Sequence, residues 1–142
     1  MSDIPKAQEL LYKGDFTCVL CKDDIVYVSK EKGISPMLDF ITNGIDLSGF
    51  SVADKIVGKA AAMLFVKAGV REVFGEVVSK EGLSFLQSEN IPCSYKILTE
   101  NIINRKGDGI CPMENEVKNI SDTDIAYDLL IKKRNELRGI QI

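Results

Sequence analysis

The sequence predicts one three-layer α/β/α sandwich over residues 1–142, built on a mixed sheet of four to five strands. Three observations predict this fold: two strand-like runs separated by only three residues, a long apolar segment at 52–68, and a strand–helix–strand unit at 72–98. A chain of 142 residues can bury a core without disulfide or metal staples. With 45% hydrophobic and 27% charged residues and no biased tract, we expect it to fold along its whole length.

The first third of the chain predicts a helix, an antiparallel hairpin and a second helix. Residues 5–13, PKAQELLYK, begin with a proline suited to the first helical position and are followed by Gly14 as a stop. FTCVLC (16–21) and IVYVS (25–29) are strand-like, and the short connection between them is typical of a hairpin. SPMLDFITNG (35–44) is typical of a short helix closed by Asn-Gly.

The middle of the chain predicts the centre of the fold. VADKIVGKAAAMLFVKA (52–68) is apolar around nearly its full circumference, so we expect a single helix that is the most buried in the protein. EVFGEVVS (72–79) and CSYKIL (93–98) are strand-like and flank a helical segment, KEGLSFLQSEN, a unit typical of a parallel strand pair. SDTDIAYDLLIKKRNELR (121–138) is a final amphipathic helix, acidic at its start and basic at its end as the helix dipole favours.

Charge and hydropathy exclude several classes of partner. The formal net charge is -3, and the basic residues are dispersed except for a cluster in the final helix, so nucleic acid is not an expected partner. No window approaches the roughly 18 apolar residues of a membrane span, and the N-terminus lacks a basic and apolar signal. We expect a cytoplasmic protein with no membrane partner, for which a small-molecule ligand and homo-oligomer formation both stay open.

The absence of histidine is the most restrictive feature of the composition, because it excludes Ser–His and Cys–His nucleophile pairs and histidine metal ligands. Cys18 and Cys21 form a C-x-x-C, but on a strand their side chains point to opposite faces, and no second C-x-x-C completes a four-ligand site. With no secretion signal, these two cysteines, Cys93 and Cys111 are expected to be reduced thiols. We expect no metal and no cofactor.

The first candidate site is the start of the predicted central helix. There Asp54 and Gly58 would lie one turn apart on one face, as would Lys55 and Lys59. Glycine costs roughly 1 kcal/mol relative to alanine inside a helix, so Gly58 suggests that a ligand needs the space beside Asp54. The alternative is structural: Ser51 and Asp54 form a variant capping box, and Gly58 allows close helix–sheet packing. Gly58–Lys59 does not fit a phosphate loop, because the pair would lie inside a helix and lacks the flanking glycine and serine or threonine.

The second candidate site is the cysteine in NRKGDGICPMENEV (104–117). Pro112 at a first helical position makes Cys111 the N-cap, and Glu114 becomes the third helical residue, whose carboxylate can reach back to the cap. Cysteine caps helices poorly, whereas a helix N-terminus and the nearby Arg105 favour its thiolate. A reactive thiol and an ordinary turn followed by a cap both fit this pattern.

The glycines ahead of that cysteine are candidates for ligand binding. Gly107 and Gly109 can bend the backbone so that its N–H groups converge on an anion. Asn104 and Arg105 precede them and could bind the same ligand through an amide and a guanidinium.

Two motifs carry a resemblance to a known family: D-K-x-x-G-K-A-A-A at 54–62 and N-R-x-G-x-G-x-C-P-M-E at 104–114. Through them nearly the whole chain resembles a family of uncharacterised bacterial and archaeal proteins, a domain of unknown function whose fold is similar to that of cytidine deaminases. Zinc nucleoside deaminases carry H-x-E or C-x-E at the start of the buried helix and P-C-x-x-C after the next strand. Here those segments read ADKIVGK and SKEGLS, so the resemblance implies the fold without metal ligands, and hydrolytic deamination is not expected.

The resemblance also implies a place for the pocket, because the N-terminus of the buried helix would line it. We therefore expect a metal-free domain that binds a small anionic, nucleotide-like ligand between Asp54 and the loop that ends at Cys111. Asp54 would be a base or hydrogen-bond acceptor and Cys111 a nucleophile, with Lys55 and Lys59 as charge partners. The alternative is a non-catalytic regulatory or assembly module, in which Asp54 and Cys111 lie apart or are packed away from solvent.

Overall fold

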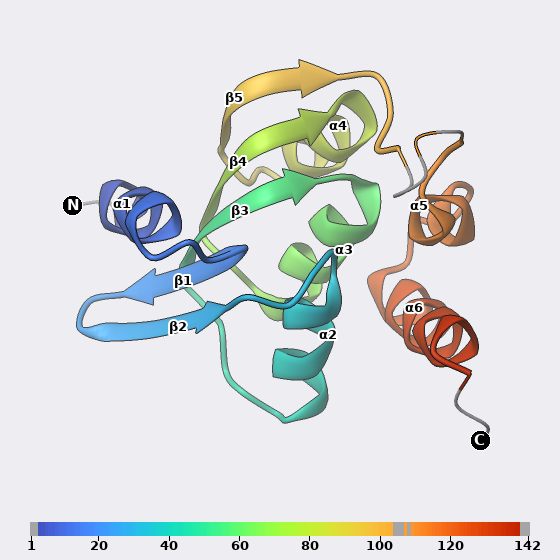
Figure 1. The fold of residues 1–142 in the computed structure, drawn as a ribbon, viewed down its shortest axis with the longest axis horizontal. Coiled ribbons are helices and arrows are strands. Elements are labelled where there is room, and N and C mark those ends of the chain that lie inside the picture. Colours follow the sequence, from blue (N-terminus) through green and yellow to red (C-terminus); the bar gives the residue numbers. More distant parts are fainter. Residues whose placement is uncertain (1–2, 104–106, 108, 140–142) are drawn as a thin grey trace.

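A computed structural model describes residues 3–103, 107 and 109–139. Its five-stranded sheet has the order β2-β1-β3-β4-β5 (Figure 1). β1 pairs antiparallel with β2 and β3, whereas β3–β4 and β4–β5 are parallel, which confirms the predicted mixed sheet. The strands are β1 Cys18–Lys22, β2 Ile25–Ser29, β3 Ser51–Val57, β4 Glu72–Ser79 and β5 Cys93–Thr99.

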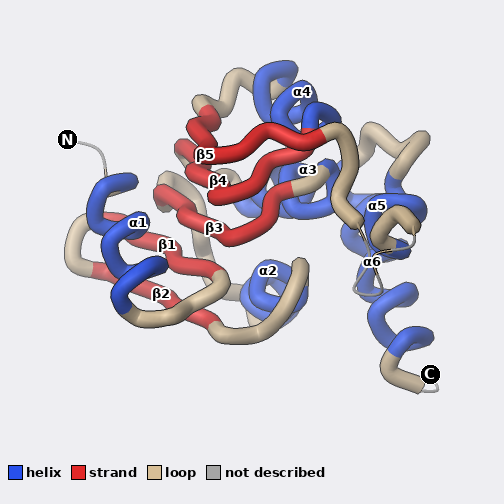
Figure 2. The backbone as a smooth tube through the Cα atoms, turned by 45° about the horizontal axis from the view of Figure 1, so that its top comes forward, coloured by secondary structure: helices blue, strands red, loops and turns tan. Residues whose placement is uncertain are grey.

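Helices flank the sheet on both faces but in unequal numbers (Figure 2). Strand alternation divides the core: Cys18 and Leu20 of β1 face the large core, whereas Val19 and Cys21 pack against α1. The large core also receives apolar side chains from all the helices except α1. The helices are α1 Ile4–Lys13, α2 Ser35–Thr42, α3 Lys59–Ala68, α4 Lys80–Ser88, α5 Pro112–Val117 and α6 Thr123–Leu137.

Most predicted elements lie within a few residues of their expected bounds. The hairpin, the helices α1, α2, α4 and α6, and the parallel β4–β5 pair are confirmed. No helix in the described ranges is both long enough and apolar enough to cross a membrane.

The prediction of one helix over residues 52–68 is wrong, because the segment divides at Gly58. Its first part is β3, the middle strand of the sheet, and only the part from Lys59 onward is helical. An apolar run without periodicity fits a doubly buried strand as well as a buried helix. The β-branched residues of SVADKIV favour the strand, whereas the three alanines at 60–62 favour the helix.

Three predictions about candidate residues are also wrong, because they depended on that helix. Asp54 and Gly58 do not share a helical face, nor do Lys55 and Lys59, because the first residue of each pair lies in β3, whereas Gly58 is the N-cap of α3 and Lys59 its first residue. Ser51 forms no capping box with Asp54; its hydroxyl donates to the Glu72 carboxylate at 2.6 Å. Gly58 and Lys59 open a helix and do not lie inside one.

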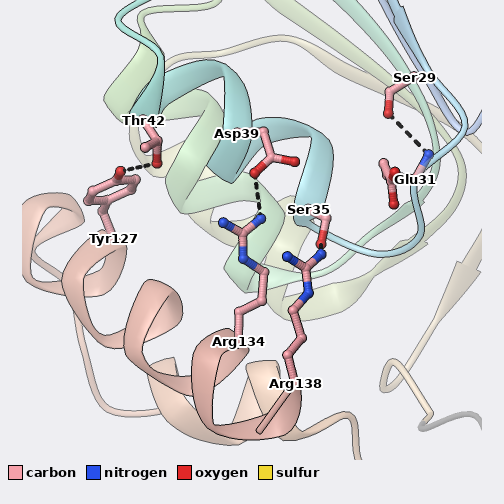
Figure 3. A network of polar contacts seen from close by, with 8 residues as sticks. All are labelled: Ser29, Glu31, Ser35, Asp39, Thr42, Tyr127, Arg134 and Arg138. Atoms are coloured by element: carbon pink, nitrogen blue, oxygen red, sulfur yellow. Dashed lines mark hydrogen bonds and ion pairs between the residues drawn. The ribbon is translucent and has the colours of Figure 1, made fainter. Parts of the chain in front are cut away.

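The C-terminal helix α6 is joined to α2 by three polar contacts (Figure 3). Arg134 Nη1 lies 2.7 Å from Asp39 Oδ1, and Arg138 Nη2 donates to Ser35 Oγ at 3.3 Å. The hydroxyls of Thr42 and Tyr127 lie 2.5 Å apart. Part of the basic cluster noted in the sequence therefore holds two distant segments of the chain together.

Candidate functional site

A cavity of about 160 Å³ lies beyond the ends of the parallel strands β4 and β5, between the start of α4 and the helix α5. In Figure 1 the arrowheads of β3, β4 and β5 point toward this side, where α5 also lies. Crevices at the carboxyl ends of parallel strands are the usual ligand sites of open α/β sheets. The cavity is lined by Ser79, Glu81, Glu100, Asn101, Ile102, Ile110, Glu114, Asn115 and Lys118.

The N-terminus of α3 is bound by a carboxylate from α5. Glu114 Oε1 accepts the Lys59 backbone N–H at 2.7 Å, and Oε2 accepts that of Ala60 at 2.9 Å. A side chain 55 positions away along the chain therefore caps α3. The prediction that Glu114 reaches back to its own helix cap at Cys111 is wrong, because both oxygens are directed to α3.

Gly58 gives Glu114 room to approach. A Cβ atom at Gly58 would lie 2.1 Å from Glu114 Oε1 and 2.8 Å from Ile102 Cγ1. The space predicted beside this glycine exists, but Glu114 and Ile102 fill it and Asp54 does not border it.

The start of α4 is capped from within its own segment. Ser79 Oγ accepts the Gly82 N–H at 3.0 Å, as expected for a serine N-cap. A Cβ at Gly82 would lie 2.9 Å from the Gly58 carbonyl carbon, so the two helix starts are in direct contact.

Carboxylates dominate the electrostatics of the cavity. Burial raises the pKa of Glu114 above its usual range, the hydrogen bonds from Ala60 and Lys59 act against this shift, and the nearby Glu81 raises the pKa further. Glu100 is paired with Lys80. Glu81, Glu100 and Glu114 thus line the cavity with Lys118 as the one basic lining residue among the described residues, so the site attracts hydrogen-bond donors and cations more strongly than anions.

Asp54 lies in β3 between Cys18 of β1 and Gly75 of β4, with 5% of its surface exposed. Its Oδ1 accepts the Ile56 N–H at 3.4 Å, and burial raises the pKa of this carboxyl to about 7. It does not line the cavity.

The two lysines predicted as charge partners lie in different surroundings. Lys55 lies over the ring of Tyr12 in α1, and its Nζ is 3.9 Å from Glu76 Oε2. Lys59 takes part in the site through its backbone N–H, while its Nζ donates to the Lys118 carbonyl at 3.1 Å.

Cys111 is the residue before α5, as predicted, but its side chain makes no capping hydrogen bond. Its backbone N–H donates to the Ile102 carbonyl at 2.9 Å, and its thiol is partly buried outside the cavity lining. Gly107 has the left-handed φ of 75°, and neither it nor Gly109 lines the cavity. Asn104 and Arg105, also predicted to bind ligand, lie outside the described residues.

Several residues of the cavity carried no strong signal in the sequence. Ser79 follows a strand and precedes a helix, a recognisable N-cap position. The remaining polar residues of the lining come from α4, from α5 and from the segments that follow β5 and α5, and only the folded chain brings them together.

A family model matches residues 6–133, which is most of the chain. The chain belongs to the TM1506 family. TM1506 is described as a domain of unknown function, DUF1893, so the predicted membership of an uncharacterised family is confirmed. No curated protein matches the chain.

The fold is shared with a solved member of the TM1506 family. A crystal structure of a DUF1893 family protein, TM1506 from Thermotoga maritima, is similar over 92% of this chain and 88% of that chain. The two sequences are 25% identical and the TM-score is 0.84. The α/β fold, with a five-stranded mixed sheet flanked by helices, is thus common to both.

Proposed function

We propose that this chain is a small-molecule-binding domain with a cytidine-deaminase-like fold, and that its ligand lies in the cavity between the start of α4 and α5. The observation that supports this proposal is the cavity itself, which lies at the carboxyl ends of β4 and β5 and is lined by convergent polar groups.

The cavity volume limits the size of the ligand. About 160 Å³ is close to the ~150 Å³ of a cavity that holds one benzene molecule, and below the ~300 Å³ at which drug-sized pockets begin. One ring-sized group fits, whereas a whole nucleotide does not. The amides of Asn101 and Asn115 can hydrogen-bond the edge of such a ring, and Ile102 and Ile110 can pack against it. A nucleobase-like group is thus a suitable ligand, but the three lining carboxylates argue against the anionic ligand that the sequence predicted.

Zinc does not fit this site. The positions that carry zinc ligands in the deaminases hold Gly58, Lys59 and Ala60 at the start of α3, and Ser79, Lys80 and Glu81 at the start of α4. In the described part of the chain, no three cysteine, aspartate or glutamate side chains are placed to share a metal ion.

Binding without catalysis is the form of this function that the geometry favours. Asp54 is packed inside the protein and Cys111 does not line the cavity, the arrangement expected of a regulatory module. The backbone of Cys111 is hydrogen-bonded to the lining residues Ile102, Glu114 and Asn115, but its side chain does not line the cavity, so nucleophilic chemistry would require the thiol to turn toward the ligand.

NMR titration of the ¹⁵N-labelled chain with cytosine and with cytidine monophosphate tests the proposal. We expect cytosine to shift the amide signals of Asn101 and Asn115, and Glu81→Gln to weaken its binding by about tenfold through loss of a charged acceptor. Glu89→Gln is the matched control, because Glu89 is exposed at the opposite end of α4. The proposal fails if neither compound shifts these signals at concentrations up to about 10 mM.

A further inference from the structure

We infer that Glu114 sets the ligand class of this cavity: its carboxylate takes the first amide donors of α3, so the site rejects anions and selects ligands with an amine or amidine group. The inference rests on the proposed function and names the class of ligand for the same site.

The first step concerns the α3 N-terminus. A free helix N-terminus attracts anions through its unpaired N–H groups and the positive end of the helix dipole. Here each Glu114 oxygen accepts one of these donors, at 2.7 and 2.9 Å. A phosphate or carboxylate ligand would have to displace a carboxylate that is already bound.

The second step concerns how firmly Glu114 is placed. Gly58 and Ile102 fit closely around its carboxylate, and Val117 of the same helix is fully buried in the large core. The Lys59 Nζ bond to the Lys118 carbonyl joins the start of α3 to the end of α5 a second time. The packing of α5 therefore holds the Glu114 carboxylate against the start of α3.

The third step concerns the other charges. Glu81 is close enough to raise the pKa of Glu114, so an amine or amidinium between the two carboxylates would relieve their repulsion. Glu100 also lines the cavity, but its charge is balanced by the ion pair with Lys80, so Glu81 and Glu114 are the carboxylates that favour a cation. The Gly82 N–H of α4 is bound by Ser79 and is not available to an anion.

Two ring-sized probes of similar shape and opposite charge test the inference: benzamidine and benzoate, titrated into the intact chain at pH 7 and followed by NMR. We expect the wild type to bind benzamidine at least tenfold more tightly than benzoate. Glu114→Ala frees the two N–H donors and removes one carboxylate, so this ratio should fall at least tenfold, with benzoate gaining affinity. Glu116→Gln is the control, because Glu116 faces Lys133 of α6 and does not line the cavity, and its ratio should match that of the wild type.

The outcomes separate the two proposals. If the wild type binds benzamidine or cytosine but prefers benzoate, or if Glu114→Ala keeps the wild-type ratio, the inference is wrong while the binding function stands. If neither probe nor cytosine binds the wild type, the proposed function is wrong, and the inference with it. If circular dichroism shows Glu114→Ala to be unfolded, Glu114→Gln gives the decisive ratio, because it keeps the shape and one acceptor and loses the charge.

Discussion

Asp54 lies in the middle of β3 and accepts hydrogen bonds from neighbouring backbone N–H groups, but burial still raises the pKa of its carboxyl from 3.8 to about 7. Burial disfavours the charged carboxylate more than these bonds and the Cys18 thiol favour it. Asp54 is therefore a residue whose charge state affects folding, even though it does not border the cavity.

The sign of the pH dependence follows from this shift. The contribution of the protonated carboxyl to stability is fully present below about pH 4 and is lost as the pH rises to about 7, because the unfolded chain releases this proton first. Asp54→Asn cannot ionise, so its free energy of unfolding should exceed that of the wild type increasingly over this window, by on the order of 2 to 4 kcal/mol at pH 8. Urea titrations at several pH values check this, and parallel curves for the two proteins would contradict it.

The four thiols differ in accessibility. Cys18 and Cys21 are buried, and burial raises the pKa of both. Burial also raises the pKa of the Cys93 thiol, to about 11. Cys111 is partly exposed ahead of α5.

Competitive alkylation should consequently label Cys111 first. With iodoacetamide near pH 7, we expect its alkylation rate to exceed that of Cys93 by about tenfold or more. The thiolate is the reacting form, and the raised pKa of Cys93 leaves little of that thiol ionised. Cys18 and Cys21 should react only after unfolding. Peptide mass spectrometry gives the four rates, and equal rates for Cys93 and Cys111 would be inconsistent with this difference.

At the scale of elements, α5 contributes the cap of α3. α5 has only six residues, yet it supplies Glu114 to a ten-residue helix that is buried over most of its length. The backbone of Gly58 is extended, with φ -103° and ψ -170°, so alanine there is compatible with the backbone and would act through its contacts with the side chains of Glu114 and Ile102.

A double-mutant cycle measures this coupling. Gly58→Ala should displace the Glu114 carboxylate and cost about 1 to 3 kcal/mol, and Glu114→Ala should cost a similar amount. Together they should cost at least about 1 kcal/mol less than the sum, because either change alone removes the same cap. Urea unfolding supplies the energies. Glu116→Ala combined with Gly58→Ala should be additive, and additivity for Glu114 as well would disprove the coupling.

At the scale of the whole molecule, the contacts between α2 and α6 join segments that are about a hundred positions apart (Figure 3). The Arg134 side chain is only 11% exposed, whereas its partner Asp39 is 46% exposed. Arg134 Nε is buried without a hydrogen-bond partner among the described residues. We therefore expect Arg134 to stabilise the fold both through packing of its methylene groups and through its contact with Asp39.

Thermal unfolding of two arginine variants tests this arrangement. Arg134→Ala should lower the free energy of unfolding by about 1 to 3 kcal/mol, since it removes a largely buried side chain and its ion pair. Arg138→Ala should change it by about 0.5 kcal/mol or less, because Arg138 is exposed and its bond to Ser35 is long. Equal losses for the two variants would show that α6 is not held chiefly through Arg134.

The sequence by itself determined the elements that carry local signals. Pro5 lies in the first turn of α1 and Gly14 follows its last residue, the connection at 23–24 gives the hairpin, and Asp122 caps α6 through hydrogen bonds to the next residues. These features depend on contacts within a few positions, which spacing and residue type reveal. The exclusion of Ser–His and Cys–His nucleophile pairs and of histidine metal ligands likewise follows from composition alone.

Only the tertiary structure decided where β3 ends and what binds α3. Residues 52–68 are apolar without a period, so their division at Gly58 depended on neighbouring strands that supply hydrogen bonds on both sides of β3. The contact between Glu114 and the α3 N-terminus joins residues 55 positions apart, and no spacing rule reaches that far. Asp54 was predicted as a site residue on the assumption of a helix. In the strand its side chain lies beside Cys18 of β1 inside the protein, because pairing with β1 and β4 fixes its orientation.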